Sequence, residues 1–355
     1  MRHLVSSDIP DIALGSSLLG AGGGGDPYVG GLIARQALDK AGSVELYDAD
    51  EVPDEWLVAT IGGVGAPSVL AEKGINGCEI TNLLAAQEEQ LGRKLDAIVL
   101  SEIGGMNSVI PVAAAAIAGI PLVNVDGMGR AFPGLQQDSY NIAGVHTWPM
   151  AFADEKGNVA MLTTVDNDWM ENLGRATVDA MGGQGIALGQ FMSGETMKRA
   201  AAIMRELHCP FVINQNRYSI FDRTIEQNGL KKTANQMGKG IIAFSPLAQG
   251  LLTDKYLHGI PSDSRIAVDG RFLHADALTK EKLAQIEALN KMAGERGQSL
   301  AQMALSWILK DEDVTSVLIG ASRPEQIIQN VEIVQNTKFT REELKKIDQI
   351  SRGDL

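Results

Sequence analysis

Four polar side chains follow two apolar segments that the sequence predicts as buried parallel strands. The segments cover residues 95–100 and 121–125. The side chains are those of Glu102, Asn107, Asp126 and Arg130. Open α/β sheets bind ligands in the loops at the carboxyl ends of their strands. We therefore predict these four residues as catalytic candidates, while the alternative that Glu102 and Asp126 cap helices or pair with Arg130 stays open.

A glycine-rich run at residues 20–25, GAGGGG, matches the pattern G-x-G-x-x-G of dinucleotide-binding loops. Asp48 and Asp50 follow at about the spacing of a ribose contact. Such a loop needs a strand before it and a helix N-terminus after it. Here residues 8–20 are predicted as a helix, and Asp26 would place a carboxylate where the pyrophosphate belongs. We interpret the run as a loop that ends a helix.

The remaining reactive side chains form no pattern typical of a metal or redox site. Cys78 and Cys209 are far apart in the sequence, and His146 lies in a predicted hairpin without a partner residue nearby. We therefore expect no metal site and interpret His146 as non-catalytic.

Composition limits the kinds of partner that the chain is expected to bind. The formal net charge is -13, which argues against nucleic acid, because phosphate binding favours a basic face. No apolar run reaches the roughly 18 residues of a membrane span, and the N-terminus, with Asp8 and Asp11, does not resemble a signal peptide. The expectation is a cytoplasmic protein that binds a small-molecule substrate and neither nucleic acid nor membrane.

Two series of elements must position these residues. The first alternates helices and strands up to residue 181, which indicates an α/β layer with a largely parallel sheet. The second begins near residue 194, with strands predicted at 211–214, 241–244 and 314–319 between helices. This alternation is typical of a (β/α) barrel, which needs eight strands. The predicted fold class is α/β, with an N-terminal α/β domain at 1–192 and the C-terminal half of a (β/α)8 TIM-type barrel at 193–355.

Several N-terminal stretches together resemble a known family. They are GAGGGGDPYVG (20–30), GGVGAPSVLAEK (62–73), SEIGGMNSVIP (101–111), DGMGRAFPGLQ (126–136) and DEKGN (154–158). Over roughly residues 8–198 the chain resembles the N-terminal domain of S-methyl-thiohydantoin desulfurase-like proteins. The resemblance implies a hydrolase-like or desulfurase-like function on a cyclic amide or thiohydantoin.

Four motifs of the second half resemble another family and fall in its order. They are NQNRYSIFDR (214–223), IIAFSPLAQGLLTDKYLHGIPSDSR (241–265), GQSLAQMALSWILKD (297–311) and TSVLIGASRPEQIIQN (315–330). Over roughly residues 195–350 the chain resembles the C-terminal half of an aldo-keto reductase. The resemblance is to the branch of glyceraldehyde-phosphate-reductase-like and potassium-channel-β-subunit-like members.

This second resemblance implies NADP(H) as the cofactor. Phe244 matches the family's aromatic residue that stacks on the nicotinamide, and Gln215 matches the glutamine that binds its carboxamide. The residues implied for the pyrophosphate are Ser245, Pro246, Leu247, Gln249 and Gly250. The residues implied for the ribose phosphate and the adenine are Gly320, Ser322, Arg323, Gln326 and Asn330. The helix expected to begin after Arg323 favours an anion at its N-terminus.

The family's catalytic tyrosine, aspartate, lysine and histidine all come from the half of the barrel that the first segment replaces. Gly189-Gln190-Phe191 stands where the family's serine-asparagine pair would be. Carbonyl reduction needs a donor to the developing alkoxide. We therefore expect an oxidoreductase fragment with weak or absent activity, and a non-catalytic fusion of two incomplete domains stays open. A half barrel leaves two strand edges exposed, which favours a homo-oligomer or a direct docking of the two parts.

Overall fold

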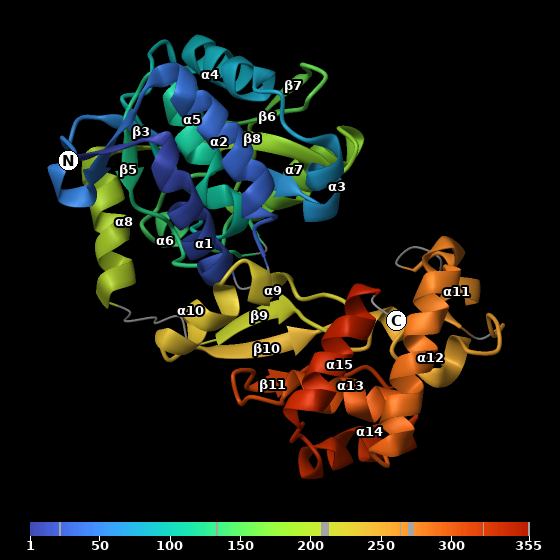
Figure 1. Cartoon of the computed structure of the whole chain (residues 1–355). Helices are drawn as coiled ribbons and strands as arrows, with labels where there is room; N and C mark the ends of the chain where they lie inside the picture. Colours follow the sequence, from blue (N-terminus) through green and yellow to red (C-terminus); the bar gives the residue numbers. More distant parts are fainter. Residues whose placement is uncertain are drawn as a thin grey trace. The chain divides into compact units, whose positions relative to one another are not determined.

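The chain forms two compact units, Met1–Phe211 and Val212–Leu355, in the computed structural model of Figure 1. The structure describes residues 1–20, 23–132, 134–206, 213–262, 264–268, 273–321 and 323–353. The units divide later in the chain than the predicted boundary at 192/193. Helix α8 (Gly194–Glu206) explains the difference, because it packs on strand β8 and helix α6 of the first unit.

The first unit is built on an eight-stranded sheet with the order β1-β2-β5-β4-β3-β8-β6-β7. Its strands are β1 (Arg2–Leu4), β2 (Val44–Asp48), β3 (Leu57–Gly65), β4 (Ala97–Leu100), β5 (Leu122–Asn124), β6 (Met150–Ala153), β7 (Val159–Leu162) and β8 (Gln184–Ser193). The four central strands β2, β5, β4 and β3 run parallel, and the outer strands pair antiparallel. Parallel strands buried on both faces read as continuous apolar runs, which is why β4 and β5 could be predicted.

Helices cover this sheet and bury its apolar residues. They are α1 (Ile9–Gly20), α2 (Pro27–Ala41), α3 (Pro67–Lys73), α4 (Cys78–Leu91), α5 (Ile110–Ala118), α6 (Ser139–Ile142), α7 (Asn167–Ala180) and α8. The alanine-rich helix α5 packs between α2 and strands β3 and β4, because its small side chains let the backbones approach closely. Helix α2 begins where Asp26 accepts a hydrogen bond from the N–H of Tyr28 and Pro27 occupies the first turn.

The glycine run after α1 packs against a second pair of glycines. The N–H of Met106 donates to the carbonyl of Gly24 at 2.7 Å. Gly24 has a φ of +76°, and a Cβ there would lie 2.2 Å from the carbonyl oxygen of Gly104. A helix, α1, precedes the run, so the structure agrees with a loop that ends a helix and not with a dinucleotide-binding turn.

Strand β8 was not predicted from the sequence. We expected Gly189-Gln190-Phe191 at the position of a barrel strand, but these residues lie in β8, antiparallel to β3 in the large sheet. β8 and β3 are more than a hundred residues apart in the sequence. Their pairing therefore depends on the tertiary fold, and no local sequence pattern indicates it.

The second unit holds a three-stranded parallel sheet with the order β11-β10-β9. Its strands are β9 (Ile213–Arg217), β10 (Gly240–Phe244) and β11 (Ser316–Val317). Its helices are α9 (Thr224–Gln227), α10 (Leu230–Gln236), α11 (Arg265–Val268), α12 (Lys280–Glu295), α13 (Leu300–Ile308), α14 (Pro324–Val331) and α15 (Arg341–Arg352). From the sequence we expect one helix over residues 222–237. This expectation is wrong, because Gly229, with a φ of +83°, separates α9 from α10.

The two faces of this small sheet differ in exposure. Asn214, Ile241 and Ala243 are fully buried on one face. Ile213 and Gln215, which alternate with Asn214 along β9, are exposed on the other. The alternation of parallel strands with covering helices makes the unit the half of a TIM-type barrel, and the chain is α/β throughout. In the part of the chain that the structure describes, no helix is long and apolar enough to cross a membrane.

Candidate functional site

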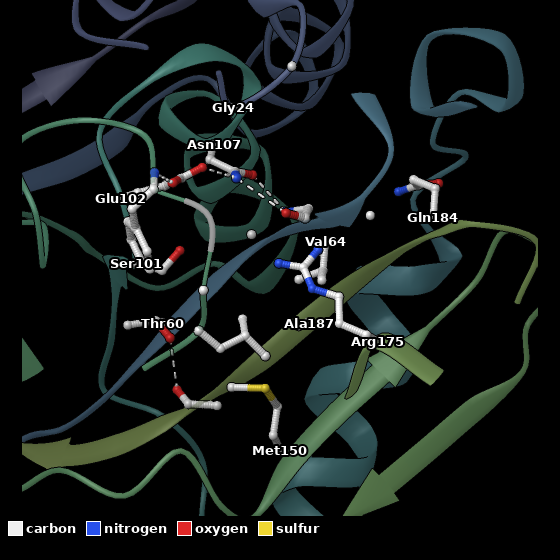
Figure 2. Close-up of a pocket in the computed structure, with 18 of the residues that line it drawn as sticks. Gly24, Thr60, Val64, Ser101, Glu102, Asn107, Met150, Arg175, Gln184 and Ala187 are labelled. Carbon is white, nitrogen blue, oxygen red and sulfur yellow. Dashed lines mark hydrogen bonds between the residues drawn. The ribbon is translucent and has the colours of Figure 1, made fainter. Parts of the chain in front are cut away.

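A cavity of about 310 Å³ opens at the carboxyl ends of β3 and β4 in the first unit (Figure 2). Glycines from β3 and from the loop after α1 line it, together with a set of polar side chains. The polar side chains are Thr60, Ser101, Glu102, Asn107, Arg175, Gln184 and Gln190. The size lies at the lower end of the range for small-molecule pockets.

Glu102 is the buried carboxyl group of this cavity, with 6% of its surface exposed. Its Oε1 accepts a hydrogen bond from Nδ2 of Asn107 at 2.6 Å, and its Oε2 accepts one from the N–H of Phe132 at 2.7 Å. Burial raises the pKa of Glu102, and the two hydrogen bonds oppose that rise because they favour the ionised form. The structure thus brings together two of the predicted candidates.

Asn107 holds the open edge of β3 as a neighbouring strand would. Strand β4 ends at Leu100, which pairs with Ile61, so the residues of β3 beyond Ile61 have no strand on that side. The N–H of Gly63 donates to Oδ1 of Asn107 at 2.7 Å, and Nδ2 of Asn107 donates to the carbonyl of Gly63 at 3.2 Å. The dashed lines of Figure 2 show this pairing, in which one carboxamide satisfies both backbone groups of one residue.

A chain of hydrogen bonds leads from the cavity into the core. The hydroxyl of Thr60 donates to Oε1 of Gln190 at 2.9 Å, and Nε2 of Gln190 donates to Oδ2 of Asp138 at 2.6 Å. Oδ1 of Asp138 accepts from the N–H of Asn141 at the start of α6. Burial raises the pKa of Asp138 to about 6, against the effect of these hydrogen bonds. The sequence did not indicate these hydrogen bonds, because Thr60, Gln190 and Asp138 come from three separate elements.

Arg175 reaches the cavity from α7, and Figure 2 shows its guanidinium directed toward the cavity. Its Nε donates to Oε1 of Glu171 at 2.7 Å, one turn earlier on the helix, and Glu171 also accepts from the N–H of Leu135 at 2.8 Å. The i,i+4 spacing of Glu171 and Arg175 was visible in the sequence. Nothing in the sequence indicated that Arg175 lines the same cavity as Glu102.

Asp126 and Arg130 do not line the cavity as the structure describes it. Oδ1 of Asp126 accepts from the N–H groups of Met128 and Gly129 at 2.8 and 2.5 Å, so the carboxylate closes its own loop. Burial raises the pKa of Asp126. Arg130 is exposed, and its guanidinium donates to the carbonyl of Ala131. His146 lies against the ring of Trp148 with centroids 4.1 Å apart.

The residues implied for the cofactor lie on the second unit. Gln215 pairs in register with Ile242, two residues before Phe244, so Gln215 and Phe244 lie on the same face of the sheet. The loop after Phe244 is unusual, because Ser245 and Gln249 have φ values of +53° and +63°. Left-handed backbone in residues other than glycine is strained and is concentrated at functional loops. Nε2 of Gln249 lies 3.4 Å from Oγ of Ser245. The other implied members of this loop are Pro246, Leu247 and Gly250.

The residues implied for the ribose phosphate lie around the start of α14. Arg323 is the residue before the helix and is exposed, and its carbonyl accepts from the N–H of Gln326 at 3.2 Å. Asn330 lies four residues after Gln326 on the same helix, and Gly320 lies in the segment before it. Ser322 lies outside the described residues.

A tyrosine and a lysine do meet in the second unit, away from these residues. Nζ of Lys310 donates to the hydroxyl of Tyr218 at 2.9 Å, and that hydroxyl donates to Glu226. Tyr218 is fully buried on the helix-covered face, opposite to Phe244. Burial lowers the pKa of Lys310 to about 8. Tyr218 has no exposed surface, so the pair lies away from the face that carries Gln215 and Phe244. In the described residues, no cluster of His, Cys, Asp and Glu could hold a metal ion.

The fold defines an α/β protein with a cavity in one unit and, in the other, the loops for which the sequence predicts a cofactor. Residues 7–164 match the sequence model of the S-Me-THD-like N-terminal domain, and residues 146–352 match that of the aldo/keto reductase family. The chain belongs to the aldo/keto reductase family. The match to the aldo/keto reductase model begins at residue 146, earlier than the motif resemblance, which begins near residue 195. It overlaps the match to the S-Me-THD-like model over residues 146–164.

Individual relatives each match part of the chain. An L-glyceraldehyde 3-phosphate reductase of Escherichia coli strain K12 is 45% identical over 196 residues, which are 54% of this chain and 57% of the relative. A protein of Schizosaccharomyces pombe named as a voltage-gated potassium channel subunit beta is 38% identical over 143 residues, 39% of this chain and 42% of that protein. The chain therefore spans only about half the length of these relatives. A solved structure from Chromobacterium violaceum is 26% identical, with a TM-score of 0.48 over 58% of this chain and 62% of that one.

Proposed function

We propose that the second unit binds NADP(H) and that the chain has weak or no carbonyl reductase activity. The observation that carries the proposal is the open face of the small sheet. On this face Gln215 and Phe244 lie together, next to a loop whose backbone is held in left-handed conformations at Ser245 and Gln249. The 45% identity over 196 residues with a protein named as a reductase supports an oxidoreductase cofactor.

The proposed weak or absent carbonyl reduction follows from the fold of the first unit. The first unit folds as an eight-stranded mixed sheet instead of completing the barrel. Without a tyrosine that donates a proton to the substrate's carbonyl oxygen, hydride transfer from a bound NADPH should be several orders of magnitude slower.

A fluorescence titration with NADPH tests the cofactor proposal. We expect a change in nicotinamide fluorescence that saturates, and a loss of that change in Arg323→Ala, because a guanidinium fork binds a phosphate bidentately. Arg341→Ala, an exposed arginine at the start of α15, is the matched control and should bind like the unsubstituted chain. Equal binding by both variants would refute the phosphate site, and no binding by the unsubstituted chain would refute the cofactor.

A second candidate function belongs to the cavity of the first unit. We propose a hydrolase-like or desulfurase-like activity on a cyclic amide or thiohydantoin. It is favoured by a buried carboxyl group of raised pKa, Glu102, held in a small-molecule cavity by Asn107. In this step water adds to the ring carbon that bears the sulfur, and one of its protons passes to the ring nitrogen. The carbon–sulfur bond breaks as the new hydroxyl becomes a carbonyl. The sulfur leaves as methanethiol with a proton that Glu102 supplies, and the hydroxyl proton returns to Glu102.

Release of methanethiol from an S-methyl-thiohydantoin tests this second function. We expect turnover that Glu102→Gln abolishes and that Glu89→Gln, at an exposed position of α4, leaves unchanged. Absence of both methanethiol release and NADPH binding would leave the chain as a non-catalytic fusion of two incomplete domains.

A further inference from the structure

The pairing of Asn107 with Gly63 shows what the open edge of β3 can bind. One carboxamide, with its oxygen and nitrogen on the same side, contacts the N–H and the carbonyl of one glycine at 2.7 and 3.2 Å. The same arrangement of donor and acceptor occurs in a primary amide and in a lactam, where the amide is cis. The edge therefore has a geometry that fits a cis amide.

Gly65 repeats this pair of backbone groups two residues later, inside the cavity. In an antiparallel ladder the residues alternate between pairs that exchange hydrogen bonds and pairs that do not. Gly63 opposite Ile186 directs its N–H away from β8, so Gly65 opposite Gln184 does the same. The N–H of Ala66 donates to the carbonyl of Gly183 beside β8 at 2.9 Å. Because the peptide is trans, the carbonyl of Gly65 points to the other side.

The position requires glycine and is part of the cavity wall. Gly65 has a φ of +120°, and a Cβ there would lie 2.4 Å from the carbonyl oxygen of Gly183. Gly65 lines the cavity together with Glu102, whose carboxyl group is fixed by Asn107 and Phe132. Arg175 is paired with Glu171, so the cavity holds few uncompensated charges and suits a neutral polar ligand.

We propose that the N–H and the carbonyl of Gly65 recognise a neutral cis amide, a lactam or a primary carboxamide, in the way that Gly63 binds Asn107. The proposal rests on the second function above, because it names the recognition element of that cavity. It differs from that function in requiring only binding, so the two can fail separately.

Four small probes in two matched pairs test the proposal on the full chain. Acetamide and 2-pyrrolidone offer a donor and an acceptor on one side. N-methylacetamide is a secondary amide that prefers the trans form by about 2.5 kcal/mol, and N-methyl-2-pyrrolidone lacks the N–H. Binding is read from the methyl signal of Met150, which lines the cavity and is identified by its loss in Met150→Leu, after labelling of the methionine methyl groups with carbon-13.

We expect acetamide and 2-pyrrolidone to shift the Met150 signal, with each N-methyl partner binding about tenfold more weakly for the loss of one hydrogen bond. Equal shifts from all four probes would overturn the proposal, since they would show an unselective cavity. No shift from any probe would overturn it as well. Methanethiol release without this selectivity would leave the second function standing while refuting the role of Gly65.

Discussion

Nδ2 of Asn107 lies 2.6 Å from Oε1 of Glu102, and the same carboxamide pairs with both backbone groups of Gly63. One side chain therefore joins the edge of β3 to the buried carboxyl group that follows β4. This relationship makes Asn107 a positioning residue, which fixes the carboxyl group and the strand edge of one cavity relative to each other.

Replacing Asn107 with alanine should destabilise the first unit by about 2–4 kcal/mol, because it leaves the N–H of Gly63 and an oxygen of Glu102 without partners in the buried loop. The free energy of unfolding in urea measures the effect. Asn124→Ala is the matched control, since Asn124 is exposed and makes one surface hydrogen bond to Asp48. Similar losses for the two variants would argue against the buried role of Asn107.

Gly24→Ala should destabilise the chain by more than about 2 kcal/mol, because the new Cβ would lie 2.2 Å from the carbonyl oxygen of Gly104 and φ is positive. Gly15→Ala, in the middle of α1 where a Cβ meets nothing within 4 Å, should instead stabilise by about 0.5–1 kcal/mol. Thermal unfolding of the two variants compares them directly. A tolerated alanine at residue 24 would contradict the packing of the two glycine loops.

The ionisation of Asp138 should make the first unit less stable as pH rises from about 4 to 6. Burial raises the pKa of Asp138 to about 6, so the folded state holds a proton that the unfolded state has already lost in this range. The total decrease in the free energy of unfolding is about 3 kcal/mol, and it is reached above pH 6. Asp138→Asn should lack this dependence, and urea unfolding at several pH values measures the difference between the two proteins. A difference that stays constant from pH 4 to 7 would refute the assignment.

Tyr218→Phe should destabilise the second unit by about 1–3 kcal/mol, because the buried groups of Lys310 and Glu226 lose the hydroxyl between them. Trp307, whose ring lies 5.2 Å from that of Tyr218, reports the unfolding by its fluorescence. Tyr28→Phe, at an exposed side chain of the first unit, is the control and should leave the Trp307 transition unchanged. An unchanged transition in Tyr218→Phe would show that the hydroxyl contributes nothing.

Local patterns predicted most elements of the first unit. The apolar runs at 95–100 and 121–125 became β4 and β5. The helices that the sequence predicts over 8–20, 28–40 and 108–118 became α1, α2 and α5, and they have clear ends in glycine or proline. The strand order was not predictable, because the pairing of β8 with β3 joins segments more than a hundred residues apart. In the second unit Gly229 divided one predicted helix into two.

The site was predictable only where its residues share a loop. Glu102 and Asn107 lie five residues apart, and the rule that ligands bind at strand ends indicated both. Arg175 and Gln190 come from elements whose position depends on the tertiary fold, so no sequence spacing relates them to Glu102. Gly65 is proposed to act through its backbone N–H and carbonyl, which nearly every residue has. The sequence therefore could not indicate its role in binding.

Binding and turnover of NADPH, measured together on the full chain, test the central claim most directly. Nicotinamide fluorescence reports binding, and absorbance reports oxidation in the same samples after glyceraldehyde 3-phosphate is added. The account predicts saturable binding that Arg323→Ala removes, with oxidation that is absent or several orders of magnitude slower than that by the 45% identical reductase of Escherichia coli. Absence of binding, or oxidation at a rate similar to that of this reductase, would contradict it.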